Sequence, residues 1–193
     1  MITKSIKGQV WIETVIYTLI GLILIAIVLA YATPKINESR DNLLIEQSIN
    51  AMQLFGEKID ETTAAGVGTR SIISLTIKKG ELLIPKSSVE NSTLDLRLSG
   101  LKKLYSEPGQ EIKLDRVSVI SREEAKSNGV SIIVRNSYPV YFCATDTGLI
   151  ADCTTESKKF AAASIPYKFS IEKALINESA PEQGIKINIR EAS

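Results

Sequence analysis

The chain has 193 residues, of which 44% are hydrophobic and 23% charged, as in a folded domain with one extra segment. Its 23 Lys and Arg residues balance 22 Asp and Glu residues, giving a net charge of +1, so nothing indicates a nucleic-acid partner. The sequence has no histidine and two cysteines, which excludes Ser-His-Asp and Cys-His triads, histidine zinc sites and iron–sulfur clusters. We therefore expect no enzyme, no metal and no cofactor.

Residues 14–33 form an uncharged, mostly apolar run near the N-terminus. At about 1.5 Å per residue, a helix over this run is roughly 30 Å long, which matches the hydrocarbon thickness of a bilayer. Lys4 and Lys7 precede the run, so we expect the N-terminus in the cytoplasm and the remainder of the chain outside the cell. The run predicts a segment held in a membrane or in an apolar core built from several copies of the chain.

Glu13 places a carboxylate at the edge of this run. A carboxylate at the centre of a bilayer costs about 2.5–3.5 kcal/mol, and less near the interface. In a simple anchor the side chain would reach the lipid headgroups. In an assembly it would meet a cation of a neighbouring chain, and the residues alone leave both interpretations open.

Lys7-Gly8-Gln9, followed by Glu13 and the apolar run, resembles the class III (prepilin-type) signal of type IV pilins in its archaeal form. Trp11 stands where the archaeal pattern has serine, and the resemblance covers roughly the N-terminal third of the chain. It implies that a membrane peptidase cuts between Gly8 and Gln9 and that the apolar helix is retained. Glu13 is then the fifth mature residue, and would pair with the new α-amino group of a neighbouring subunit and set the register.

The same resemblance implies how the chain is used. A pilin-like subunit is stored in the membrane lipid and polymerises, with itself or in a mixed filament, on the cell surface. Its partners are prepilin peptidase, an assembly ATPase and a membrane platform protein, and its exposed part serves adhesion or contact. Removal of residues 1–8 deletes two lysines and leaves a mature charge of −1.

Two other fates of the apolar run stay open. Ala30-Tyr31-Ala32 has the small-x-small pattern of a secretory cleavage site, although the run exceeds the usual 7–15 residues of such signals. Alternatively, the run is an uncleaved single-span anchor for an extracellular binding domain that does not polymerise.

A second, amphipathic helix segment is predicted over residues 36–62, after Pro34, which should kink the helix or mark its exit from the membrane. Its apolar residues recur at spacings of 4, 3, 3 and 4, which places them on one helix face: Ile45, Ile49, Met52, Phe55 and Ile59. Gly66-Val67-Gly68 should end the helix. We expect this face to pack on the domain that follows.

The remaining sequence alternates with period two, which predicts strands. The expected strands are residues 71–77, 81–84, 94–98, 112–120, 130–135, 139–143, 165–170 and 185–190. Turns are expected at Lys79-Gly80, Glu107-Pro108-Gly109 and Asn128-Gly129, and residues 121–127 suit a short helix.

The predicted fold class is therefore α+β, with a long helix packed on a mostly antiparallel, pilin-like β head. Its segments are a leader (1–8), an apolar helix (9–33), an amphipathic continuation (34–65) and an extracellular head (66–193).

Three further features belong to the predicted head. Cys143 and Cys153 flank a turn sequence, and outside the cell we expect them to form a disulfide worth about 3 kcal/mol. Asp146-Thr147-Gly148 in that turn matches the aspartic-protease tripeptide, but one copy supplies only one of the two carboxylates required. Asn91 and Asn177 are candidate glycan acceptors, and Asn37, close to the apolar run, is a less credible one.

Overall fold

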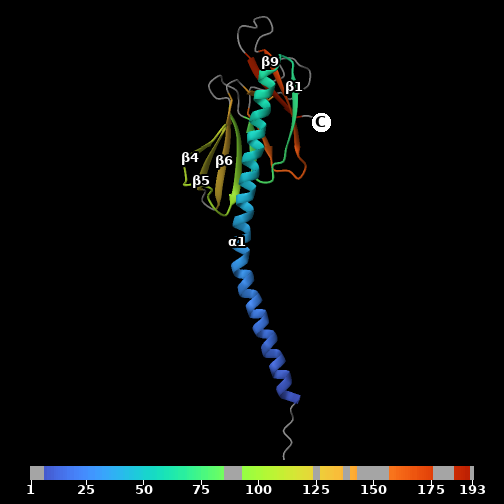
Figure 1. The fold of residues 1–193 in the computed structure, drawn as a ribbon, viewed down its shortest axis with the longest axis vertical. Helices are drawn as coiled ribbons and strands as arrows, with labels where there is room; N and C mark the ends of the chain where they lie inside the picture. Colours follow the sequence, from blue (N-terminus) through green and yellow to red (C-terminus); the bar gives the residue numbers. More distant parts are fainter. Residues whose placement is uncertain are drawn as a thin grey trace, which may run out of the picture. The chain divides into compact units, whose positions relative to one another are not determined.

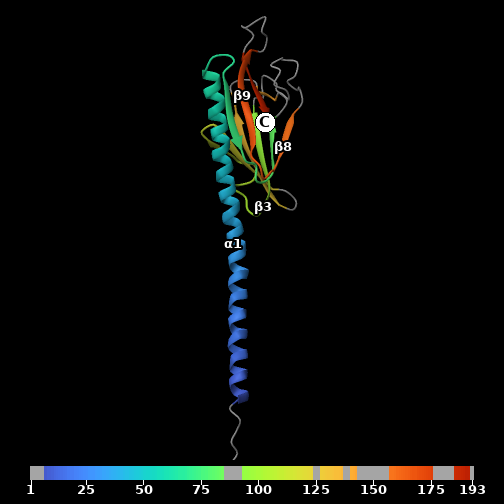
Figure 2. The ribbon, with the colours of Figure 1, turned by 90° about the vertical axis from the view of Figure 1, so that its right-hand side faces the viewer.

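The computed structural model describes residues 7–84, 93–123, 127–136, 140–142, 157–175 and 185–191. The chain divides into two compact units, Met1–Arg40 and Asp41–Ser193, and helix α1 (Lys7–Ala64) belongs to the first over its N-terminal part and to the second thereafter. The predicted fold class is confirmed, because one long N-terminal helix packs against mostly antiparallel sheets in an α+β arrangement (Figure 1, Figure 2).

Helix α1 continues without a break through Pro34, so the proline does not end it. The predicted apolar face is confirmed, since Ile45, Ile49, Met52, Phe55 and Ile59 are all buried. The helix ends at Ala64, just before the predicted glycines. Asp41–Ala64 is thus the part of α1 that joins the core of the second unit.

A lysine from a distant strand satisfies the C-terminal end of α1. The last turn of the helix holds no basic residue of its own. Lys173 Nζ instead donates to the carbonyl oxygens of Thr63 at 2.5 Å and Ala65 at 2.8 Å. A cation at this end meets the negative pole of the helix dipole and the carbonyl groups that the helix leaves without partners.

In the described part of the chain, the smaller sheet has four strands in the order β1-β9-β10-β7. These are β1 (Arg70–Leu75), β9 (Tyr167–Leu175), β10 (Ile185–Glu191) and β7 (Val140–Phe142). Neighbouring strands are antiparallel except β10 and β7, which are parallel.

The larger sheet has six described strands in the order β4-β5-β6-β3-β2-β8, all antiparallel to their neighbours. These are β4 (Glu111–Leu114), β5 (Val117–Glu123), β6 (Asn128–Arg135), β3 (Thr93–Leu101), β2 (Glu81–Ile84) and β8 (Lys158–Ala161). Along β3, buried Leu94, Leu96 and Leu98 alternate with Asp95 and Arg97 on the opposite face. One face of the sheet therefore belongs to the core.

The core joins α1 to both sheets. The ring of Phe55 on α1 meets the ring of Phe169 on β9 edge to face, with centroids 5.7 Å apart. The neighbouring Gly56 faces the larger sheet so closely that an added Cβ would lie 3.1 Å from Val134 Cγ1 on β6. The expectation that a sheet packs on the amphipathic helix is thereby confirmed.

Several predicted strands match the observed ones, but the expected strand over residues 112–120 is wrong. It is two strands, β4 and β5, joined by a turn at Asp115 and Arg116, with Asp115 at φ 53°. The apolar residues change phase there, from even to odd positions, because a two-residue turn reverses the chain between them.

The predictions around residues 121–129 also need correction. Residues 121–123 continue β5 rather than starting a helix, and Asn128-Gly129 begins β6 rather than forming a turn. The pairing of Glu123 with Asn128 places the reversal between them, so the glycine lies in the sheet opposite Arg122. The turn expected at Glu107-Pro108-Gly109 is confirmed by a hydrogen bond from Gln110 N to Glu107 O.

Strand β8 was not predicted, and β9 begins two residues later and ends five residues later than expected. In β8 only Phe160 is buried, so its short sequence has no alternation to detect. The longer β9 is explained by its pairing with both β1 and β10.

Candidate functional site

The first candidate site is the apolar N-terminal part of α1. From Trp11 to Tyr31, fifteen large apolar side chains are exposed, with values of 45–73%. This is the one helix in the described part of the chain that is long and apolar enough to span a membrane. Helices of soluble proteins bury such side chains against a core, whereas these side chains are exposed in the structure.

Two threonine hydroxyls within this segment are compatible with an apolar surrounding. Thr18 Oγ1 donates to the carbonyl of Thr14 at 3.0 Å, and Thr33 Oγ1 donates to that of Leu29 at 2.7 Å. The hydroxyls of Thr18 and Thr33 are therefore satisfied inside the helix, which lowers the cost of placing them in lipid or in an assembled core.

Glu13 and the predicted cleavage site lie at the N-terminal end of this segment. Gly8 and Gln9 lie in the first turn of α1, and the side chain of Glu13 is exposed. No hydrogen bond or ion pair to Glu13 is found among residues 7–84 or the later described ranges. The carboxylate is thus available to a group outside the chain.

Asp41 is a buried carboxylate where α1 enters the second unit, and the sequence analysis missed it. Its Oδ1 accepts from Lys79 Nζ at 3.0 Å, and its Oδ2 accepts from Lys102 N at 2.8 Å. Burial by itself would raise the pKa of Asp41, but these two hydrogen bonds and the charge of Lys79 outweigh it and hold the pKa below the ordinary 3.8. No sequence signal marks this site, because both partners come from loops between strands.

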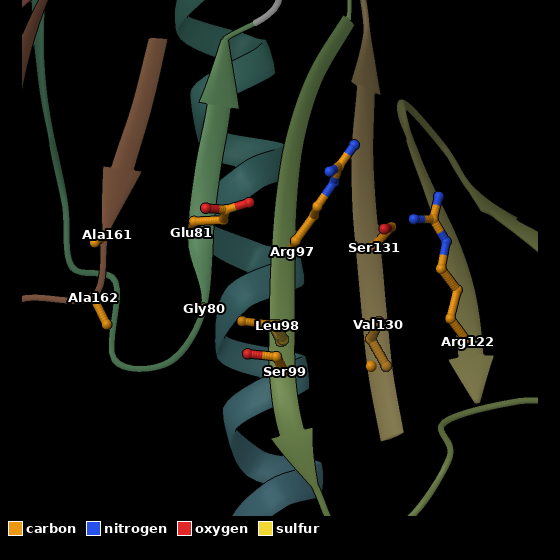
Figure 3. Close-up of a pocket in the computed structure, with 11 residues that line it drawn as sticks. Gly80, Glu81, Arg97, Leu98, Ser99, Arg122, Val130, Ser131, Ala161 and Ala162 are labelled. Atoms are coloured by element: carbon orange, nitrogen blue, oxygen red, sulfur yellow. The ribbon is translucent and has the colours of Figure 1, made fainter. Parts of the chain in front are cut away.

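The second candidate site is a groove of about 580 Å³ on the face of the larger sheet that points away from α1 (Figure 3). Arg97 on β3 pairs in register with Glu81 on β2 and with Ser131 on β6. Arg122 reaches the groove from β5, and its register partner is Gly129. With Ala161 of β8, residues from five strands thus line the groove. The alternation of residues along a single strand does not predict such a meeting.

A close backbone approach shapes one end of this groove. Gly80 has φ +84°, and a Cβ at this position would lie 1.8 Å from the carbonyl oxygen of Arg97. The predicted turn at Lys79-Gly80 is present. It requires glycine at position 80 because the backbone is left-handed there and because β3 leaves no space for a side chain.

The remaining predicted site residues lie outside the described residues: Cys143, Cys153, Asn91, Asn177 and the tripeptide Asp146-Thr147-Gly148. Asn37 lies within α1 and is partly exposed. The described residues contain no group of three or more Cys, Asp or Glu side chains placed to hold a metal ion.

Comparisons with protein-family models, with curated proteins and with solved structures found no match to this chain.

Proposed function

We propose that the chain is a structural subunit of a type IV pilus-like surface filament, stored in the membrane and polymerised through its N-terminal helix. The observation that carries this proposal is the continuous exposure of large apolar side chains between Trp11 and Tyr31. Burying each such side chain is worth about 1.5–3 kcal/mol, so a surface of this size needs lipid or copies of itself around it.

Polymerisation in this proposal is an exchange of one apolar surrounding for another. Residues 14–33 leave the lipid and become the core of the filament, so little apolar area meets water at any stage. The satisfied hydroxyls of Thr18 and Thr33 favour this exchange, since they need no new partner in either surrounding. Energy for extraction would come from a separate ATPase acting with a membrane platform protein.

Glu13 would set the axial register between subunits. Cleavage between Gly8 and Gln9 by prepilin peptidase would create an α-amino group, whose unperturbed pKa is about 8, so it is a cation at neutral pH. Pairing with this cation would offset the cost of holding the carboxylate in an apolar core, and an unpaired carboxylate would be costly. The availability of Glu13 within its own chain supports an intermolecular partner.

The second candidate function is a single-span, membrane-anchored binding domain that stays outside the cell and does not polymerise. The groove lined by Arg97 and Arg122 favours it, because a binding domain needs a surface groove for its ligand, whereas polymerisation through the helix does not. In both proposals the second unit lies outside the cell.

Sequencing the mature N-terminus tests the proposal. We expect chains isolated from the producing cell to begin at Gln9. An intact Met1 would instead support the uncleaved anchor, and a start at Thr33 would support secretion; either result would refute the filament proposal.

A further inference from the structure

The groove on the larger sheet holds a guanidinium group that has no carboxylate partner among the described residues. Three other arginines of the second unit each pair with an acid: Arg70 with Glu172, Arg116 with Asp60 and Arg135 with Glu111. Arg122 is exposed at the groove, and no such pair is found for it in the described ranges. Unlike those three arginines, Arg122 therefore has its guanidinium group available to a ligand.

Arg97 is held so that its outer nitrogens remain available. Its Nε donates to Asp95 Oδ2 at 2.7 Å, and no other hydrogen bond of Arg97 is found within the described residues. Asp95 is itself buried, with 8% of the residue exposed, so this bond fixes the guanidinium group of Arg97 to the sheet. The Nη1 and Nη2 atoms are therefore left for a ligand, in the fork geometry that suits a carboxylate.

The two guanidinium groups converge on one place. Figure 3 shows those of Arg97 and Arg122 on either side of Ser131, in front of the strands. Across the groove, Oε1 of Glu81 lies 3.7 Å from Nζ of Lys159, so these two charges compensate each other. The positive charge of Arg97 is compensated by the carboxylate of Asp95. The uncompensated charge among these groups is the single positive charge of Arg122.

We propose that this groove binds a sugar unit bearing one carboxylate, such as a hexuronate of an acidic polysaccharide. The carboxylate would lie between Arg97 and Arg122, and one negative charge matches the one uncompensated positive charge. Ser99, Ser131 and Glu81 line the same groove and supply hydrogen-bonding groups for ring hydroxyls. The volume of about 580 Å³ lies within the range of small-molecule sites, about 300–1,000 Å³. The inference does not depend on polymerisation of the chain.

Isothermal titration of the full chain in zwitterionic detergent micelles tests this, with trigalacturonate as the probe. Maltotriose serves as the uncharged sugar, and inorganic phosphate as the anion without a sugar. We expect saturable binding of one trigalacturonate per chain that weakens as salt is added, and much weaker binding of the other two probes. Equal affinity for maltotriose or for phosphate would overturn the assignment to a uronate.

Variants of the arginines sharpen the test. Arg122→Gln should weaken trigalacturonate binding about tenfold, and Arg122→Lys, which keeps the charge but loses the fork, should weaken it less. Arg40→Gln is the matched control, since Arg40 is exposed and does not line the groove. Arg122 has no partner in the described chain to lose, so the thermal unfolding midpoint should not change. Loss of binding in Arg40→Gln as large as in Arg122→Gln, or none in Arg122→Gln, would refute the proposal.

Discussion

Asp41 shows how a single carboxylate ties a helix to two loops of a β domain. It is 6% exposed and receives one hydrogen bond from a charged side chain and one from a backbone amide. Such a carboxylate stabilises the fold only while it is ionised, because its protonated form accepts these bonds less well. Because the pKa of Asp41 is lowered in the folded state, the free energy of unfolding depends on pH through this group.

Asp41→Asn should lower the free energy of unfolding by about 1–2 kcal/mol at pH 7, since it weakens two hydrogen bonds at a buried position. The folded-state pKa of Asp41 lies below the unfolded-state value of about 3.8, so its contribution is complete above that pH and is lost as the pH falls through the folded-state pKa.

Urea unfolding at a series of pH values, followed by circular dichroism, measures this. The difference between wild type and Asp41→Asn should shrink below about pH 3.8, and exposed Glu46→Gln serves as control. A difference that stays constant down to pH 2 would contradict the assignment.

Gly80 is a second residue whose identity the structure requires. Gly80→Ala should destabilise the chain by more than about 3 kcal/mol, because the new methyl group would overlap the carbonyl oxygen of Arg97 and the backbone is left-handed. Gly100→Ala is the matched control: Gly100 has φ +73° but open space around it, so only the backbone cost of about 1 kcal/mol should appear. Equal thermal shifts of the two variants would show that the contact with β3 is unimportant.

At the scale of elements, the C-terminal end of α1 depends on strand β9. Lys173→Gln should lower the free energy of unfolding by about 1–2 kcal/mol, since it removes a cation that bonds two helix carbonyls. Hydrogen exchange should accelerate in the last turn before Ala64. Lys168→Gln, on the same strand and exposed, should change neither quantity. Unchanged exchange at the helix end would contradict the capping role.

The elements also show which structural features the sequence could predict. The buried face of α1 from Ile45 to Ile59 follows from spacing alone, because helix geometry is local. The division between β4 and β5 and the start of β6 were missed, since a short turn interrupts alternation for only two residues. Arg97 and Arg122 meet at one groove because β3 pairs with β6, where Arg97 lies opposite the sequence-distant Ser131, and alternation carries no such information.

At the scale of the whole molecule, the apolar core formed by the described residues lies in the second unit. Its buried residues extend from Ile45 to Ile189, and none lies in the N-terminal apolar segment. A chain consisting of residues 35–193 should therefore fold and remain soluble in water, whereas the full chain should require detergent. Size-exclusion chromatography with circular dichroism distinguishes the two; aggregation of the shortened chain would mean that the first unit contributes to the fold.

The proposed assembly into a filament is also tested at this scale. Glu13→Ala should leave the amount of subunit in the membrane unchanged and abolish filaments, because the register contact proposed for the carboxylate is lost. Electron microscopy of sheared surface material, with membrane immunoblots, provides the measurement. Glu46→Ala is the control, as Glu46 is an exposed acid farther along α1. Normal filaments from the Glu13 variant would refute the proposed register contact.

The sequence by itself determined the long helix, its apolar and amphipathic parts and the β character of the second unit, because hydrophobic periodicity is a local property of the chain. Only the tertiary structure decided the order of the strands, the burial of Asp41, the lysine at the end of α1 and the meeting of two arginines at one groove. Each of these depends on contacts between residues far apart in the sequence, and such contacts are set by how the elements pack.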